Sequence, residues 1–240
     1  MKQQRLDKVL SNSGYGSRSE IKKYAKSKTI KVDGKVVTDT ATHVDPTLSV
    51  IEINGEKLNF KENVYVMMNK PAGVITATYD ERLKTVIDLL PESLSCFGLF
   101  PVGRLDIDTE GLLILTTDGQ LSHSLTSPKR HVAKRYYAII EGEVTEKDVT
   151  AFSQGVTLDD GYKTKPGELI IYKVGAISEI ELIIYEGKFH QVKRMFEAVG
   201  KKVKYLRRLQ IGGLKLDESV ELGECRELTA AEVESLKSGE

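Results

Sequence analysis

The sequence lacks the features that define several large protein classes, and each absence narrows what the chain can be. Its 240 residues include two cysteines, Cys96 and Cys225, which lie far apart and outside any CxxC spacing. We therefore expect neither a disulfide framework nor a zinc site, and interpret both thiols as reduced. No apolar run approaches the roughly 18 residues that a membrane span requires. The polar start MKQQRLDKVL is unlike a signal peptide, so we expect a cytoplasmic protein with no membrane partner.

Several common catalytic motifs are also missing. The chain contains no GxxxxGKS/T, HExxH, GxGxxG or GxSxG, which argues against nucleotide hydrolysis and zinc proteolysis. The segment DIDTEG begins like a calcium loop, but Thr117 stands where that loop needs its final glutamate. The histidines show no metal-like pairing (His43, His123, His131, His190). We therefore expect no metal site.

Charge is balanced overall but segregated along the chain. The 35 basic and 35 acidic residues give a formal net charge of zero. Residues 1–38 nevertheless carry ten basic side chains against three acidic ones, and residues 187–208 carry eight against one. Residues 216–240 restore the balance with eight acids and two bases. This segregation favours a polyanionic partner that binds at two separate surfaces.

The first 58 residues have the pattern of a small helix-helix-strand unit. Apolar spacing predicts a short helix at residues 5–10, and Ser17 and Glu20 have the spacing of a capping box at the start of a second helix. Residues 30–37 and 50–58 each contain an Asp-Gly or Asn-Gly dipeptide between β-rich flanks, which predicts two tight hairpins. We place a linker at residues 59–63.

A larger unit is expected from residue 64 to residue 240. Apolar segments predict strands, and helical spacing or capping residues predict helices. The expected strands are 64–68, 111–117, 134–140 and 177–185; the expected helices are 85–90, closed by Pro91, one capped by Asp118, and 192–199, ended by Gly200. The fold class is therefore α+β, with a mixed, mostly antiparallel sheet and flanking helices.

Three segments combine polar residues with strongly apolar neighbours: GRLDIDTEGLL at 103–113, HVAKRYY at 131–137 and EGKFHQVKRMFEAVG at 186–200. Each alone has a structural explanation. Asp106 could cap a turn, Tyr136 could be a half-buried strand residue, and Lys193 with Arg194 could form a solvated helix face. The order and the exact residues of the three segments together are far more specific to one protein family than any one segment.

Together these segments resemble the pseudouridine synthases of the RsuA family, named for the enzyme of the small ribosomal subunit. GRLD matches the segment with the catalytic aspartate, and the family's K-x-Y and HQVKRM segments are also matched. NKP at residues 69–71 fits as well. The beginning of the chain, with RLDKVL, SRSEIKK and KVDGKVV, resembles an RNA-binding module of a small-subunit ribosomal protein. Arg135 and Tyr137 depart from the residues that relatives often carry there.

The resemblance implies a role for each matching residue in the pocket. Asp106 would act as nucleophile or base at the sugar, which requires an ionised carboxylate. Lys193 would be the cation that keeps this carboxylate ionised away from water. Tyr136 would stack on the extruded uracil, worth roughly 1 to 3 kcal/mol, and could move a proton. Arg104 would hold the nucleotide out of its helix. The isomerisation involves no net redox change, so no cofactor is expected.

Other candidates have weaker support. Arg194 and Gln191 would bind substrate, although packing or phosphate contact explains them, Glu186 and His190 equally well. On the first two helices, a set of basic side chains would contact RNA phosphates, which position a complex without reading sequence (Arg5, Lys8, Arg18, Lys22, Lys23).

Three functional readings stay open. The wording of HQVKRMFEAVG and of TKPGEL at residues 164–169 favours one uridine in the helix 18 region of 16S rRNA, presented on free RNA or on a partly assembled small subunit. The alternatives are the same chemistry on 23S rRNA and a non-catalytic ribosome-assembly factor. A metal-dependent nuclease using Asp106 and Asp108 is disfavoured, because an extended chain would point Asp108 to the other side. A monomer is the default expectation.

Overall fold

In the computed structural model, which describes residues 3–238, helices α1 (Leu6–Asn12) and α2 (Arg18–Lys26) open the chain. Ser17 caps α2: its hydroxyl accepts from the Glu20 backbone N–H, and the Glu20 carboxylate accepts from the Ser17 backbone N–H. The predicted capping box is therefore confirmed. The two helices bury Leu6, Leu10 and Ile21 in a common apolar core.

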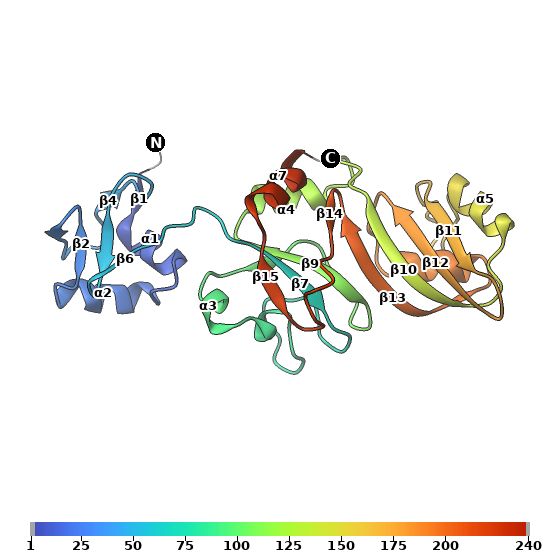
Figure 1. Ribbon diagram of the computed structural model, residues 1–240, viewed down its shortest axis with the longest axis horizontal. Helices are drawn as coiled ribbons and strands as arrows, with labels where there is room; N and C mark the ends of the chain where they lie inside the picture. Colours follow the sequence, from blue (N-terminus) through green and yellow to red (C-terminus); the bar gives the residue numbers. More distant parts are fainter. Residues whose placement is uncertain (1–2, 239–240) are drawn as a thin grey trace. The chain divides into compact units, whose positions relative to one another are not determined.

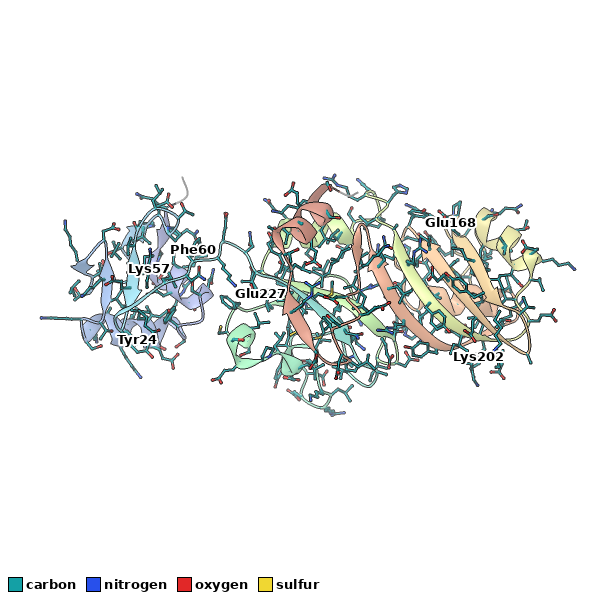
Figure 2. The ribbon with its side chains drawn as sticks, viewed as in Figure 1. Tyr24, Lys57, Phe60, Glu168, Lys202 and Glu227 are labelled. Atoms are coloured by element: carbon teal, nitrogen blue, oxygen red, sulfur yellow. The ribbon has the colours of Figure 1, made fainter. Side chains whose placement is uncertain are left out.

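A four-stranded sheet in the order β3-β2-β5-β6 completes this core. Its strands are β2 (Ile30–Val32), β3 (Lys35–Val36), β5 (Ile51–Ile53) and β6 (Glu56–Lys57); β1 (Gln4–Arg5) pairs separately with β4 (His43–Val44). Both expected hairpins are confirmed, and both residues of each turn have the positive φ that such turns require. Figure 2 labels Tyr24, Lys57 and Phe60 in this part of the chain.

The chain divides into two units, Met1–Val64 with Leu90–Leu99, and Tyr65–Leu89 with Phe100–Glu240. The second contains a nine-stranded sheet. Seven of its strands follow the order β11-β12-β10-β13-β9-β7-β15, and the other two, β8 and β14, pair with β9 and β13 (Figure 1). Its strands are β7 (Tyr65–Lys70), β8 (Phe100–Pro101), β9 (Glu110–Thr116), β10 (Lys134–Glu141), β11 (Glu168–Lys173), β12 (Ile177–Ile184), β13 (Lys202–Ile211), β14 (Leu214–Lys215) and β15 (Cys225–Glu227). The β9–β13 pair is parallel, whereas the neighbouring pairs are antiparallel, so the predicted α+β class is confirmed.

Helices cover this sheet in two groups. α5 (Glu146–Gln154) contacts β11 (Figure 1). α6 (Gln191–Ala198) contacts β13, and the rings of Phe152 on α5 and Phe196 on α6 pack with their centroids 4.9 Å apart. α4 (Gly119–Thr126) contacts α7 (Ala230–Ser238), and Asp118 caps α4 as expected, accepting from two backbone N–H groups. Among residues 3–238, no helix is both long enough and apolar enough to cross a membrane.

One expected helix was wrong. Residues 85–90 contain only a short 3-10 turn, Ile87–Leu89, at whose start the Asp88 carboxylate accepts from the Thr85 N–H and hydroxyl. Pro91 follows this turn and is also the N-cap residue of the next helix, α3 (Glu92–Ser95). A proline before a first helical turn loses no hydrogen bond, so both roles fit the same sequence.

Candidate active site

Asp106 lies in a tight turn between β8 and β9. The Thr109 N–H donates to the Asp106 carbonyl oxygen at 3.1 Å, so the chain here is folded and not extended. The expectation that Asp108 points to the opposite side was therefore wrong. The Lys193 ammonium lies 3.4 Å from Asp106 Oδ2 and donates to Asp108 Oδ1 at 2.5 Å. One lysine thus bridges both carboxylates of the turn.

The beginning of α6 brings a second nitrogen group to Asp106. His190 is the N-cap residue of α6 and has a left-handed backbone, with φ of 48°. Its Nε2 lies 3.6 Å from Asp106 Oδ1, whereas the ion pair of Lys193 is with Oδ2. The Asp106 side chain keeps a quarter of its surface exposed. Sequence reasoning named His190 only as a weaker candidate, because its approach to Asp106 depends on the loop before α6.

The bridge favours the charged form of the second carboxylate. Burial alone would raise the pKa of Asp108, but the hydrogen bond and the charge of Lys193 outweigh it and hold that pKa below its ordinary value. Asp108 therefore shares the lysine as an anion. We infer that Asp108 helps to position the Lys193 ammonium beside Asp106.

Lys70 supports the turn from beneath, and sequence reasoning missed it. The side chain is fully buried at the end of β7. Its ammonium donates to the carbonyl oxygens of Pro71, Asp106 and Thr109 at 3.0 to 3.1 Å, with Ile107 at 3.4 Å. Burial lowers the pKa of Lys70 to about 8, against the opposing pull of the nearby carboxylates. The NKP motif marked this segment, but nothing in it indicated a contact with the catalytic turn.

Two further contacts from the same segment hold the turn. The Gly73 N–H donates to the Ile107 carbonyl oxygen at 2.7 Å. The Thr76 hydroxyl donates to the Leu105 carbonyl oxygen at 2.8 Å and accepts from the Leu105 N–H at 3.1 Å. The backbone on both sides of Asp106 is thus fixed before any substrate arrives, which is what preorganised chemistry requires.

Tyr136 and Asp106 line one cavity. Tyr136 lies on β10, directly after a bulge in the pairing of β10 with β13, and it is 7% exposed. Bulges of this kind redirect side chains beside active sites. The cavity is open to solvent, and its free space has a volume of about 50 Å³. The cavity is lined by Arg104, Leu105, Asp106, Thr109, Tyr136, Ile184, Lys188, His190, Gln191, Val192 and Leu206.

The predicted substrate-binding residues have different surroundings. Arg104 is exposed at the cavity wall. Gln191 also lines the cavity, but its amide is engaged, accepting from the Lys188 N–H and donating to Glu186. Arg194 is absent from the lining and forms ion pairs with Asp159 and Asp160. Substrate contact therefore stays a prediction for all three, and the structure gives Gln191 and Arg194 a supporting task.

The predicted RNA-binding residues belong to the amino-terminal unit. Lys8, Arg18, Lys22 and Lys23 are exposed along α1 and α2. Arg5 is half-exposed, but its guanidinium binds the buried Asp7 carboxylate through two nitrogens at 2.7 and 3.1 Å. The four other side chains can approach a phosphate backbone, whereas Arg5 would have to share its charge with Asp7.

The arrangement suits a reaction at one carbon centre. It offers a carboxylate beside a cation, in a turn held by buried donors, with an aromatic ring in the lining of the same mixed polar and apolar cavity. Within residues 3–238, no group of three or more histidine, cysteine or carboxylate side chains could hold a metal ion. A carboxylate so placed can attack carbon or remove a proton.

Comparison with known proteins identifies the class. A family model described as RNA pseudouridylate synthase matches residues 64–198, and one described as S4 domain matches residues 4–50. A solved structure titled "Crystal structure of pseudouridylate synthase" is 36% identical with a TM-score of 0.68, over 97% of this chain and 99% of that chain. The fold and the site define an RNA-modifying isomerase with a separate S4 RNA-binding domain.

Curated relatives extend the match over the whole length. "Uncharacterized RNA pseudouridine synthase YtzG" of Bacillus subtilis (strain 168) is 47% identical, covering 97% of this chain and 98% of the relative. "Ribosomal small subunit pseudouridine synthase A" of Yersinia pestis is 38% identical, covering 97% of each. "Ribosomal large subunit pseudouridine synthase B" of Bacillus subtilis (strain 168) is 37% identical, covering 98% and 96%. The chain belongs to the RNA pseudouridylate synthase family, as the sequence resemblance predicted.

Proposed function

We propose that this enzyme converts one uridine of ribosomal RNA to pseudouridine, with Asp106 as the catalytic carboxylate. The observation that carries the proposal is that Asp106 lines one pocket with Tyr136 and has the Lys193 ammonium 3.4 Å away, within a pseudouridine synthase domain. The S4 domain and its exposed basic side chains support an RNA substrate. We further propose residues 1–58 as the RNA-binding domain, 59–63 as a linker and 64–240 as the catalytic domain.

The reaction sets the task of each group. The bond from ribose C1′ to uracil N1 must break, and a bond from C1′ to C5 must form, while C5 loses a proton and N1 gains one. In our proposal the Asp106 carboxylate acts at the sugar, as nucleophile at C1′ or as base. Lys193 holds that carboxylate in its anionic form, and Tyr136 stacks on the detached uracil while it turns. Arg104, at the cavity wall, would keep the nucleotide extruded.

The finer assignment is a uridine in the helix 18 region of 16S rRNA, on free RNA or on a partly assembled small subunit. The wording of HQVKRMFEAVG and TKPGEL supports it, as does the similarity to a relative named for the small subunit. A relative named for the large subunit is almost as similar, so 23S rRNA is the second candidate. We propose a monomer that acts in the cytoplasm.

Mapping the product tests this proposal. The purified protein is incubated, without metal or nucleotide, with small-subunit rRNA, partly assembled small subunits and large-subunit rRNA. Pseudouridine is then located by reverse transcription after carbodiimide treatment. We expect one new stop in the helix 18 region. A stop only in large-subunit rRNA would refute the substrate, and no stop in any RNA would favour a non-catalytic assembly factor.

A further inference from the structure

Phe189 is a large apolar side chain that lies in the open beside the pocket. Its surface is 72% exposed, and its ring stacks on that of His190, with centroids 3.8 Å apart and planes inclined by 17°. Single exposed apolar residues are common and need no explanation by themselves. Phe189 differs because its stacking partner lies 3.6 Å from the catalytic carboxylate of Asp106.

The loop that carries Phe189 is braced from both ends. The Phe189 carbonyl oxygen accepts from Arg194 Nη1 at 3.4 Å, and the Arg194 guanidinium is itself held by Asp159 and Asp160. On the other side, the Lys188 N–H donates to Gln191 Oε1 at 2.8 Å. These contacts fix the backbone on both sides of the ring.

Buried contacts beneath the loop strengthen this bracing. Glu186 is 4% exposed and accepts three hydrogen bonds, from the Tyr162 hydroxyl at 2.6 Å, the Lys165 N–H at 3.0 Å and Gln191 Nε2 at 2.9 Å. Three hydrogen bonds offset much of the free energy that burying a carboxylate costs, and they hold the carboxylate in place. The exposed ring therefore stands on a rigid base, and little order has to be imposed when a ligand binds it.

The surroundings favour a nucleic acid over an apolar partner. Lys188 and Arg104 line the cavity next to this loop, and Lys193 lies one helical turn further along α6. A flat aromatic face among cationic side chains is the combination with which proteins bind single-stranded bases, since every base has a π-face and its phosphate needs a counter-charge. Apolar protein interfaces instead exclude charge from their centre.

We propose that the stacked rings of Phe189 and His190 form a platform for one unpaired RNA base adjacent to the target uridine. This inference rests on the proposed function. When the target uridine leaves its stack, its neighbour loses a stacking partner on that side. The exposed face of Phe189 replaces that partner just outside the pocket, and so positions the strand while Asp106 acts within it.

A tryptophan reporter tests this directly, because the chain contains no tryptophan. The variant F189W carries the only indole, and we expect its fluorescence to be quenched when the rRNA transcript binds. F189A and F189L should each lower kcat/KM by about 5- to 150-fold, the range for loss of one base stack, whereas F189W should stay within about threefold of wild type. Y172A is the matched control, because Tyr172 is an exposed aromatic residue on β11, and it should match wild type.

An abasic substrate identifies the base involved. Two RNAs are made, each with an abasic residue on one side of the target uridine. For one of the two, the kcat/KM of the wild type should fall about as much as F189A lowers it on intact RNA; for the other it should not fall. On the RNA for which it falls, F189A should cause no further loss, as expected when two changes remove one contact. Equal activity of F189L and wild type, or an additive loss on both abasic RNAs, would overturn the platform.

The same samples separate this inference from the proposed function. Turnover by the wild type, without quenching of F189W or loss in F189A, would overturn the platform and leave the function standing. Quenching of F189W without wild-type turnover on any rRNA would refute the function, and with it the placement of the base beside a target uridine, and would leave only RNA binding at Phe189. Quenching by an added protein extract but not by RNA would overturn the platform in favour of a protein contact.

Discussion

Replacing Lys70 by Met separates what the buried lysine does for stability from what it does for the catalytic turn. Unfolded, the ammonium titrates near 10.5, whereas burial lowers its pKa to about 8 in the folded chain. Between these two pH values the unfolded chain binds more protons, so stability rises with pH. The stability gained when Lys70 loses its proton is fully present above pH 10.5 and is lost as the pH falls through 8.

The size of the effect follows from the shift. A difference of about 2.5 pKa units corresponds to about 3 kcal/mol at roughly 1.4 kcal/mol per unit, and we treat this as an upper bound. Met has a similar length and no titratable group. The free energy of unfolding of the wild type, relative to K70M, should therefore increase by about 1 to 3 kcal/mol from pH 7.5 to pH 10.5.

Urea unfolding of both proteins across this pH range measures the difference, because surface groups shared by the two chains cancel. If the difference in unfolding free energy between wild type and K70M changes by less than about 0.5 kcal/mol across this pH range, the reasoning is refuted. The turnover of K70M is the second measurement. Met cannot donate to the carbonyl oxygens of Asp106 and Thr109, so kcat should fall at neutral pH while RNA affinity is unchanged.

Three further changes have clear expected outcomes. Arg226 binds Glu232 and lowers the pKa of its carboxyl from 4.5 to about 2. E232Q should therefore destabilise the chain by about 1 to 2 kcal/mol at neutral pH. In urea unfolding, the difference between E232Q and wild type should vanish as the pH falls from 4.5 through 2. Gly111 has φ of 97°, and a Cβ there would overlap the Arg208 carbonyl oxygen, so G111A should cost more than about 2 kcal/mol in thermal unfolding; a loss below about 0.5 kcal/mol would contradict the packing. K193M should lower kcat at least about 100-fold and change RNA affinity less than threefold, and unchanged kcat would exclude Lys193 from catalysis.

Local chemistry could be predicted from the sequence where neighbouring residues determine it. The Ser17–Glu20 capping box and the Asp118 cap each depend on residues within three positions, and both are confirmed. The central strand β13 was missed because KVKYLRRLQI has many charged residues. In the structure Arg208 is buried, and its Nε donates to the Leu112 carbonyl oxygen on the neighbouring strand. Such a strand depends on partners that lie far away in the sequence.

The same distinction applies to the active site. The motif order predicted Asp106, Tyr136 and Lys193; in the structure Asp106 and Tyr136 line one pocket, and Lys193 forms an ion pair with Asp106. Lys70 and His190 reach the site only through the pairing of β7 with β9 and the left-handed turn before α6, so no spacing in the sequence could indicate their contacts. The position of Asp108 was misjudged for a related reason: an extended chain was assumed where the backbone turns.

The variant Asp106→Asn tests the central claim most directly, because it keeps the shape of the side chain and removes the carboxylate. Pseudouridine formation and RNA affinity are measured together, on the rRNA that the wild type modifies. The account predicts no detectable product and an affinity within a few fold of wild type, since the basic S4 domain is unchanged. Product formed by Asp106→Asn enzyme free of wild-type contamination would contradict Asp106 as the catalytic residue.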